Sequence, residues 1–244
     1  VWLSGGLFVL AVFLSTAINV AMTGSMIVNP TDMQIDSSLP KSEQMKMAQD
    51  AFQSSSALLI GNVLLIIAMS WIAIAWHRFV LLEESSPQLF PNWNTARLFH
   101  YLGKTLLLVF LIAIGLALPL AVLSLLLSGA GLNGLMPFFS LGLFVCVYYF
   151  FFRAGLVLPA IALDKRLSFS ESLQKTAELS NAIWGTAMIV VGVSFAVAIL
   201  LGALMPNNIF GVLANAVVQW FMVMISASLL PTLYGHAVER RPLD

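Results

Sequence analysis

Six long runs of apolar residues, separated by short polar segments, dominate this chain. A helix of about 20 apolar residues crosses the hydrocarbon core of a bilayer, so the pattern predicts six transmembrane helices. The fourth run is the shortest, and we expect it to continue as a bent helix through Pro159 to Asp164. The predicted spans are residues 2–28, 57–79, 105–127, 138–152, 183–204 and 209–234.

Two further segments have helical spacing but are too polar to cross a membrane. In residues 42–56, apolar or small side chains recur every three or four positions, which predicts a helical lead-in to the second span, on or above the outer surface. In residues 168–180, Ser168 and Glu171 have the spacing of a capping box. The helix that follows would place Phe169, Leu173, Ala177 and Ser180 on one face. This pattern predicts an amphipathic helix on the cytoplasmic surface.

Composition supports a membrane protein. Hydrophobic residues make up 60% of the 244 residues and charged residues 9%, against roughly a quarter charged in soluble domains. We therefore expect an all-α integral membrane bundle, a single transmembrane domain over residues 1–244. Because the sequence begins at Val1, without Met and already in apolar sequence, we expect its N-terminus to be incomplete.

The basic residues fall mainly on one side of the predicted membrane. Only Lys41 and Lys46 face the other side. The remaining nine of the eleven are Arg78, Arg97, Lys104, Arg153, Lys165, Arg166, Lys175, Arg240 and Arg241. Basic residues near helix ends stay in the cytoplasm, which predicts cytoplasmic N- and C-termini. The net charge is zero, so nothing in it favours nucleic acid as a partner.

No arrangement of residues predicts chemistry. The chain has no glycine-rich phosphate loop, nucleophile elbow or His-Glu metal motif. Its one cysteine, Cys146, excludes a disulfide within the chain. The three histidines, His77, His100 and His236, fall at the predicted interface without metal-ligand spacing. We therefore expect no enzyme activity, no metal and no cofactor.

Two arginines are candidate contacts for a lipid phosphate or another anion. Arg153 is the charge nearest the membrane interior, and its guanidinium can bind an anion through two N–H groups. The alternative is that Arg153 extends from the end of the fourth span to the interface. Arg78 belongs to an aromatic and basic collar, Trp76-His77-Arg78, that suits the headgroup layer.

Uncharged polar and small residues within the spans are the other candidates. The predicted intramembrane polar face consists of Asn19, Asn62, Asn215 and Gln219. These side chains would either line a substrate path or form hydrogen bonds to neighbouring helices. Small residues spaced by four allow helices to approach closely. Such packing stripes are Ala113, Ala117 and Ala121 in the third span, and Ser194, Ala198 and Gly202 in the fifth.

Residues 152–181 resemble a known family. The segment contains Arg153, then Leu156 to Ala162 with Pro159, then Ser168-Phe169-Ser170-Glu171-Ser172 opening a helix toward Asn181 and Trp184. Together with Trp76-His77-Arg78-Phe79, it resembles poorly characterised bacterial six-span inner-membrane proteins similar to the membrane domain of glycerophosphoryl diester phosphodiesterases. The resemblance implies a membrane module in the bacterial inner membrane. It transfers no catalytic residue, since the catalytic residues of those enzymes belong to a separate soluble barrel.

These observations favour a non-enzymatic membrane protein that acts as a scaffold, an assembly factor or an accessory subunit. Its partners would be membrane lipids and other membrane-protein subunits. The alternative is a transporter or lipid-handling protein that uses Arg153 with the polar face of Asn215 and Gln219.

Overall fold

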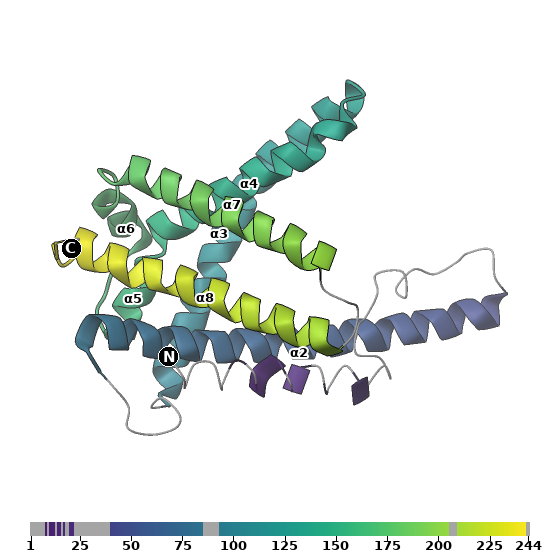
Figure 1. Ribbon diagram of the computed structural model, residues 1–244, viewed down its shortest axis with the longest axis horizontal. Helices are drawn as coiled ribbons and strands as arrows, with labels where there is room; N and C mark the ends of the chain where they lie inside the picture. Colours follow the sequence, from purple (N-terminus) through teal and green to yellow (C-terminus); the bar gives the residue numbers. More distant parts are fainter. Residues whose placement is uncertain are drawn as a thin grey trace. The chain divides into compact units, whose positions relative to one another are not determined.

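The computed structural model describes residues 40–84, 93–204 and 209–242, together with scattered positions between 8 and 21. These residues are mostly helical and include no strand (Figure 1). The described helices are α2 (Lys41–Leu82), α3 (Thr95–Gly129), the short 3-10 helix η2 (Asn133–Leu135), α4 (Met136–Ala154), α5 (Val157–Ala162), α6 (Phe169–Lys175), α7 (Ser180–Leu204) and α8 (Ile209–Ala237).

Four of these helices are long and apolar enough to cross a membrane. They are α2, α3, α7 and the Leu213–Ala237 part of α8. The apolar part of α4, Phe138–Ala154, is shorter. The predicted first span falls outside the described residues, apart from the scattered positions. The described part of the chain is therefore an all-helical protein whose long apolar helices indicate a membrane environment.

Contacts between residues divide the chain into two compact units. The described residues up to Ile72 belong to unit 1, and those from Ala73 onward belong to unit 2. The boundary falls inside α2, which is one unbroken helix from Lys41 to Leu82. The predicted helical lead-in is thus confirmed as helix, joined to the second span without a break.

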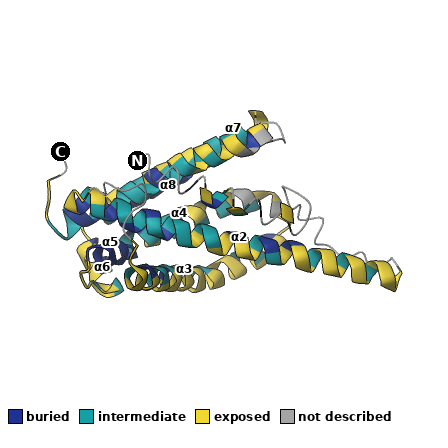
Figure 2. Cartoon of the chain, turned by 90° about the horizontal axis from the view of Figure 1, so that it is seen from below, coloured by how far each residue is buried: buried dark blue, intermediate teal, exposed yellow. Residues whose placement is uncertain are grey.

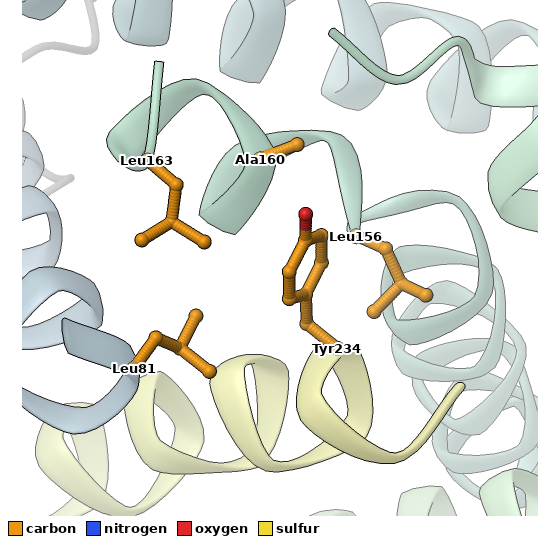
Figure 3. Close-up of a cluster of buried hydrophobic side chains, with 5 residues drawn as sticks. All are labelled: Leu81, Leu156, Ala160, Leu163 and Tyr234. Carbon is orange, nitrogen blue, oxygen red and sulfur yellow. The ribbon is translucent and has the colours of Figure 1, made fainter. Parts of the chain in front are cut away.

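The core of unit 2 lies where α5 meets the ends of α2 and α8. Leu81 of α2 and Tyr234 of α8 pack with side chains from the α5 region (Figure 3). All residues of α5 are buried (Figure 2), which is unusual for a helix of only six residues next to a charged loop. The five members of the cluster are Leu81, Leu156, Ala160, Leu163 and Tyr234.

A second cluster joins α4 to α7. Val145 of α4 packs with Ala187 and Val191 of α7, and Leu141 and Tyr148 flank them. Because Ala187 is fully buried, the two helices approach closely at that point. The fourth predicted span corresponds to α4, which ends at Ala154. The expected bent continuation is a separate short helix: the chain breaks before Pro159, and α5 runs only from Val157 to Ala162, short of Asp164.

The predicted amphipathic helix is shorter than expected. The capping box between Ser168 and Glu171 is confirmed, but α6 ends at Lys175 instead of reaching Ser180. Thr176 forms the C-terminal cap and is fully buried. The buried side chain within α6 is Ser172, whereas Leu173 of the predicted apolar face is exposed. The most deeply buried side chains at α6 are therefore the hydroxyl groups of Ser172 and Thr176, and the predicted apolar face is only partly buried, at Phe169.

Candidate functional site: a helix junction centred on Arg153

The junction centred on Arg153 begins where α4 stops. The last carbonyl groups of a helix have no amide donor from a following turn. The amide of Gly155 donates to the Phe151 carbonyl at 2.8 Å. A Cβ atom at Gly155 would collide with that same oxygen. The Arg153 carbonyl receives its donor from elsewhere: the hydroxyl of Ser172, at 2.6 Å. Ser172 thus substitutes for the missing turn of α4.

The Arg153 side chain binds the same helix from the other direction. Its Nη2 donates to the Leu173 carbonyl at 2.7 Å, and its Nε donates to the Thr176 hydroxyl at 3.3 Å. Thr176 in turn lies 2.9 Å from the Ser172 carbonyl. Both the backbone and the side chain of Arg153 therefore hold α6 and its cap against the end of α4.

Tyr149 extends the junction to α7. Arg153 Nη1 donates to the Tyr149 hydroxyl at 3.1 Å, and the guanidinium lies 5.6 Å from the centre of the tyrosine ring. The same hydroxyl is 2.8 Å from the hydroxyl of Ser180, at the start of α7. The rings of Tyr149 and Trp184 meet edge to face, with centroids 4.9 Å apart. One arginine and one tyrosine thus link α4, α6 and α7.

A second charged cluster surrounds Asp164, just after α5. Arg97 of α3 binds its carboxylate with two N–H groups, at 3.0 and 2.7 Å, while Arg78 of α2 lies 3.4 Å away. The hydrogen bond and charge of Arg97 lower the pKa of Asp164. Arg78 also donates to the Ala162 carbonyl at 2.8 Å and pairs with Glu84. Asp164 therefore ties the loop after α5 to two other helices.

The segment after α8 forms a third contact with this end of unit 2. Lys165 and Glu239 form an ion pair at 2.9 Å, which raises the pKa of the lysine. Arg241 donates to the Leu81 carbonyl at 2.9 Å and also pairs with Glu239. The C-terminal segment thereby contacts both the end of α2 and the loop after α5.

His77 is buried rather than placed at an open interface. Its side chain is 1% exposed, and Nε2 lies 3.2 Å from the Tyr101 hydroxyl of α3. Within the part of the chain that the structure describes, no hydrogen-bond partner meets Nδ1. Among the described residues, no group of three His, Cys, Asp or Glu side chains could hold a metal ion.

Both arginines that were predicted to bind an anion form hydrogen bonds with groups of the protein itself. Arg78 contacts Glu84, Asp164 and a carbonyl, and Arg153 uses three of its N–H groups inside the junction. A guanidinium has five N–H donors, so two of those on Arg153 have no partner among the residues that the structure describes.

The predicted polar face is not brought together with Arg153. Asn215 and Gln219 are exposed on α8. The side chain of Leu230, on α8, lies against Gly155. Leu230 therefore marks the position along α8 that is next to the end of α4. Gln219 precedes Leu230 by eleven residues, or about 16 Å along a helix. Asn62 donates to the Leu58 carbonyl of its own helix at 2.8 Å, and Asn19 lies outside the described residues.

Both small-residue stripes are open. Ala113, Ala117 and Ala121 are exposed on α3. On α7, Ala198 is exposed, and a Cβ atom added at Gly202 would have no neighbour within 4 Å. Ser194 is partly buried and donates to the Val190 carbonyl of its own helix. Neither stripe forms the packing surface of the described chain, because α7 meets α4 through Ala187 and Val191 instead.

Sequence reasoning missed the partners that define the junction, which are Tyr149, Ser172 and Thr176. It also missed Asp164, the centre of the second charged cluster. One signal was available: Ser172 and Thr176 are four apart, so the two hydroxyl groups share one face of a short helix.

Comparisons of the chain with protein-family models, with curated proteins and with solved structures gave no match. The resemblance to the membrane domain of the phosphodiesterases therefore stays a prediction. The class that the structure itself defines is a helical, membrane-embedded protein whose charged groups connect helices to one another.

Proposed function

We propose that this chain is a non-enzymatic scaffold or accessory subunit of a bacterial inner-membrane complex, with six spans and both termini in the cytoplasm. The single observation that carries the proposal is the openness of the α3 stripe: Ala113, Ala117 and Ala121 are exposed and uncharged. Small residues at this spacing allow a second helix to approach a membrane helix closely. In this proposal the partner's helix occupies that position.

The Arg153 junction, at the C-terminal end of α4, supports the same function. Its contacts fix α4, α6 and α7 relative to one another, and Asp164 fixes α3 to the loop after α5. A scaffold needs such fixed helices, because partners recognise surfaces whose geometry does not change. The basic residues around this end suit the cytoplasmic headgroup layer, where anionic lipids attract them.

The test is recovery of partners from membranes. The full chain, tagged, is extracted with a mild detergent, and co-purifying subunits are identified by mass spectrometry. Ala117→Trp fills the stripe, while Val122→Trp adds the same bulk to the far side of α3, where the side chain is also exposed. We expect Ala117→Trp to lose the partner subunits and Val122→Trp to keep them. Equal recovery with both variants, or no partner with any form, would overturn the proposal.

Lipid handling is the second candidate function, and the two unused N–H donors of Arg153 favour it. The test is retention of anionic phospholipid by the purified chain in native mass spectrometry. Arg153→Lys removes the two-pronged donor and should release the lipid. Tyr149→Phe disturbs the same junction but keeps the guanidinium, so it should retain the lipid. If the two variants behave alike, lipid handling by Arg153 is wrong.

A further inference from the structure

α2 is much longer than a membrane crossing requires. Its 42 residues span about 63 Å, whereas the hydrocarbon core is about 30 Å thick. The apolar run of this helix begins at Ala57, and Met45 precedes Ala57 by twelve residues, or about 18 Å. Because the helix is unbroken, its first four turns continue along the axis of the span. If the membrane crossing begins at Ala57, these turns extend beyond the hydrocarbon core, where lipid does not cover their apolar side chains.

Four large apolar side chains recur on α2 at intervals of seven residues. Met45, Phe52, Leu59 and Ile66 are 74%, 73%, 66% and 45% exposed. We call these four residues the heptad seam. The intervening positions, three residues further on, carry the smaller Ala48, Ser55 and Asn62. A seven-residue repeat of this kind is the pattern by which two helices pair along their length.

The opposite face of α2 is already occupied within unit 1. Ser54 and Ala57 are buried, and a Cβ atom at Gly61 would collide with the Ser15 hydroxyl. These positions lie about half a turn from the heptad seam. Ser15 therefore lies against one face of α2, whereas the four residues of the heptad seam are exposed.

We propose that α2 pairs in parallel with α2 of a second copy of this chain through the heptad seam. Two copies inserted the same way in one membrane bring identical residues to the same depth, so Phe52 meets Phe52 and Leu59 meets Leu59. In such a parallel pair, a charged residue beside the seam would face the same charge on the other copy and repel it. Between Met45 and Ile66 the only ionisable residues are Lys46 and Asp50, and both lie on the side of the helix away from the seam. The absence of charge beside this stretch of the seam therefore suits pairing with a second copy of the chain.

Asn62 adds a reason for pairing within the membrane. Its side chain uses one N–H on the Leu58 carbonyl of its own helix. The amide keeps a second N–H and its carbonyl oxygen, which can bond the same amide of the second copy. A single polar residue in such a seam fixes the register of two helices. The heptad seam belongs to unit 1 and the α3 stripe to unit 2, so the inference uses other residues than the proposed function and does not depend on it.

Cysteine cross-linking of the full chain in native membranes tests the pairing. In a Cys146→Ser background, Ala48→Cys places a thiol beside the heptad seam, while Gln53→Cys places one elsewhere on the same exposed stretch. Mild oxidation should give a disulfide-linked dimer of this chain with Ala48→Cys, and at least about tenfold less with Gln53→Cys. Adding Phe52→Ser should reduce the Ala48→Cys product about tenfold, since truncating a central aromatic anchor weakens an interface at least that much.

The cross-linking results distinguish a second copy of the chain at the heptad seam from a different protein at the same place. Phe52 is exposed in a single chain, so Phe52→Ser leaves the folding of each copy intact. A dimer that forms at Ala48→Cys, fails at Gln53→Cys and weakens with Phe52→Ser supports the pairing. Equal cross-linking at both positions, no product, or a product with a different protein would overturn it.

Discussion

Ser172→Ala should destabilise the protein through a single hydroxyl group. Ser172 is fully buried, and its hydroxyl is the close donor to the carbonyl that α4 leaves unpaired at Arg153. Removing it leaves a buried acceptor without its donor, at a cost of about 1–3 kcal/mol. The Thr176 hydroxyl is 3.4 Å from the same oxygen and can replace part of the lost bond. We therefore expect a loss of about 1–2 kcal/mol.

The hydroxyl groups of Ser172 and Thr176 share one acceptor, the Arg153 carbonyl, and this leads to a second prediction. Thr176→Val alone should cost about 1 kcal/mol, because Ser172 still serves the carbonyl. The double variant should lose more than the sum of the single variants, since neither hydroxyl can then replace the other. Non-additive losses are expected only where two side chains act on one group.

Thermal unfolding of the purified chain, followed by tryptophan fluorescence, measures these losses. For a chain of this size, 1 kcal/mol corresponds to about 2–4 °C in Tm, so Ser172→Ala should lower Tm by about 2–8 °C. Ser170→Ala is the matched control, because Ser170 is exposed on the same helix. If the two variants unfold at the same temperature, or the double variant shows simple additivity, the account of the junction is wrong.

Three further changes test the other contacts of unit 2. Gly155→Ala should cost about 1–3 kcal/mol, since its methyl group would collide with backbone at the end of α4, and thermal unfolding measures the loss. Asp164→Asn keeps a residue type that tolerates the positive φ of 57° but removes the charge that Arg97 binds. Because the pKa of Asp164 is lowered in the folded chain, its contribution to stability is present above the unfolded pKa of 3.8 and is lost as pH falls through the folded value. Lys165→Gln removes a group with a raised pKa, so the contribution of its pair with Glu239 is present below the unfolded pKa of 10.5 and is lost as pH rises through the folded value.

Each of these changes has a result that would contradict it. Gly192→Ala is the control for Gly155→Ala, because nothing lies within 4 Å of a Cβ atom at that position. Equal Tm values for the two glycine variants would refute the steric argument. For the ion pairs, Tm is measured against pH. The Asp164 variant should differ from the parent at neutral pH and converge with it in acid, and the Lys165 variant should converge at high pH. Parallel curves would contradict both assignments.

The helices could be predicted from sequence because the physics that places them is local. A long apolar run requires its backbone hydrogen bonds to be formed internally, and a helix does this with neighbouring residues. The capping box at Ser168 was equally predictable, since both of its bonds join residues three apart. The lead-in to the second span followed from spacing alone.

The contacts of the junction could not be predicted in the same way. Ser172 finds the Arg153 carbonyl only because α4 stops one residue later, and the two residues are 19 apart. Asp164 meets Arg97 across 67 residues. Such pairs depend on how helices pack, which the apolar pattern does not encode. For the same reason the sequence does not say whether a small-residue stripe meets the same chain or a partner, and in the described residues α7 contacts α4 through Ala187 and Val191.

The burial of α5 against α8 has a consequence for synthesis of the chain. Leu156 and Ala160 lie beside Tyr234, and α8 is the last of the described helices to leave the ribosome. Until it arrives, the apolar side chains that Tyr234 will cover remain uncovered next to a charged loop. A nascent chain arrested before α8 therefore exposes apolar side chains that are buried in the finished protein. Proteases that remove incomplete membrane proteins can use this exposed surface to distinguish the arrested chain from the finished one.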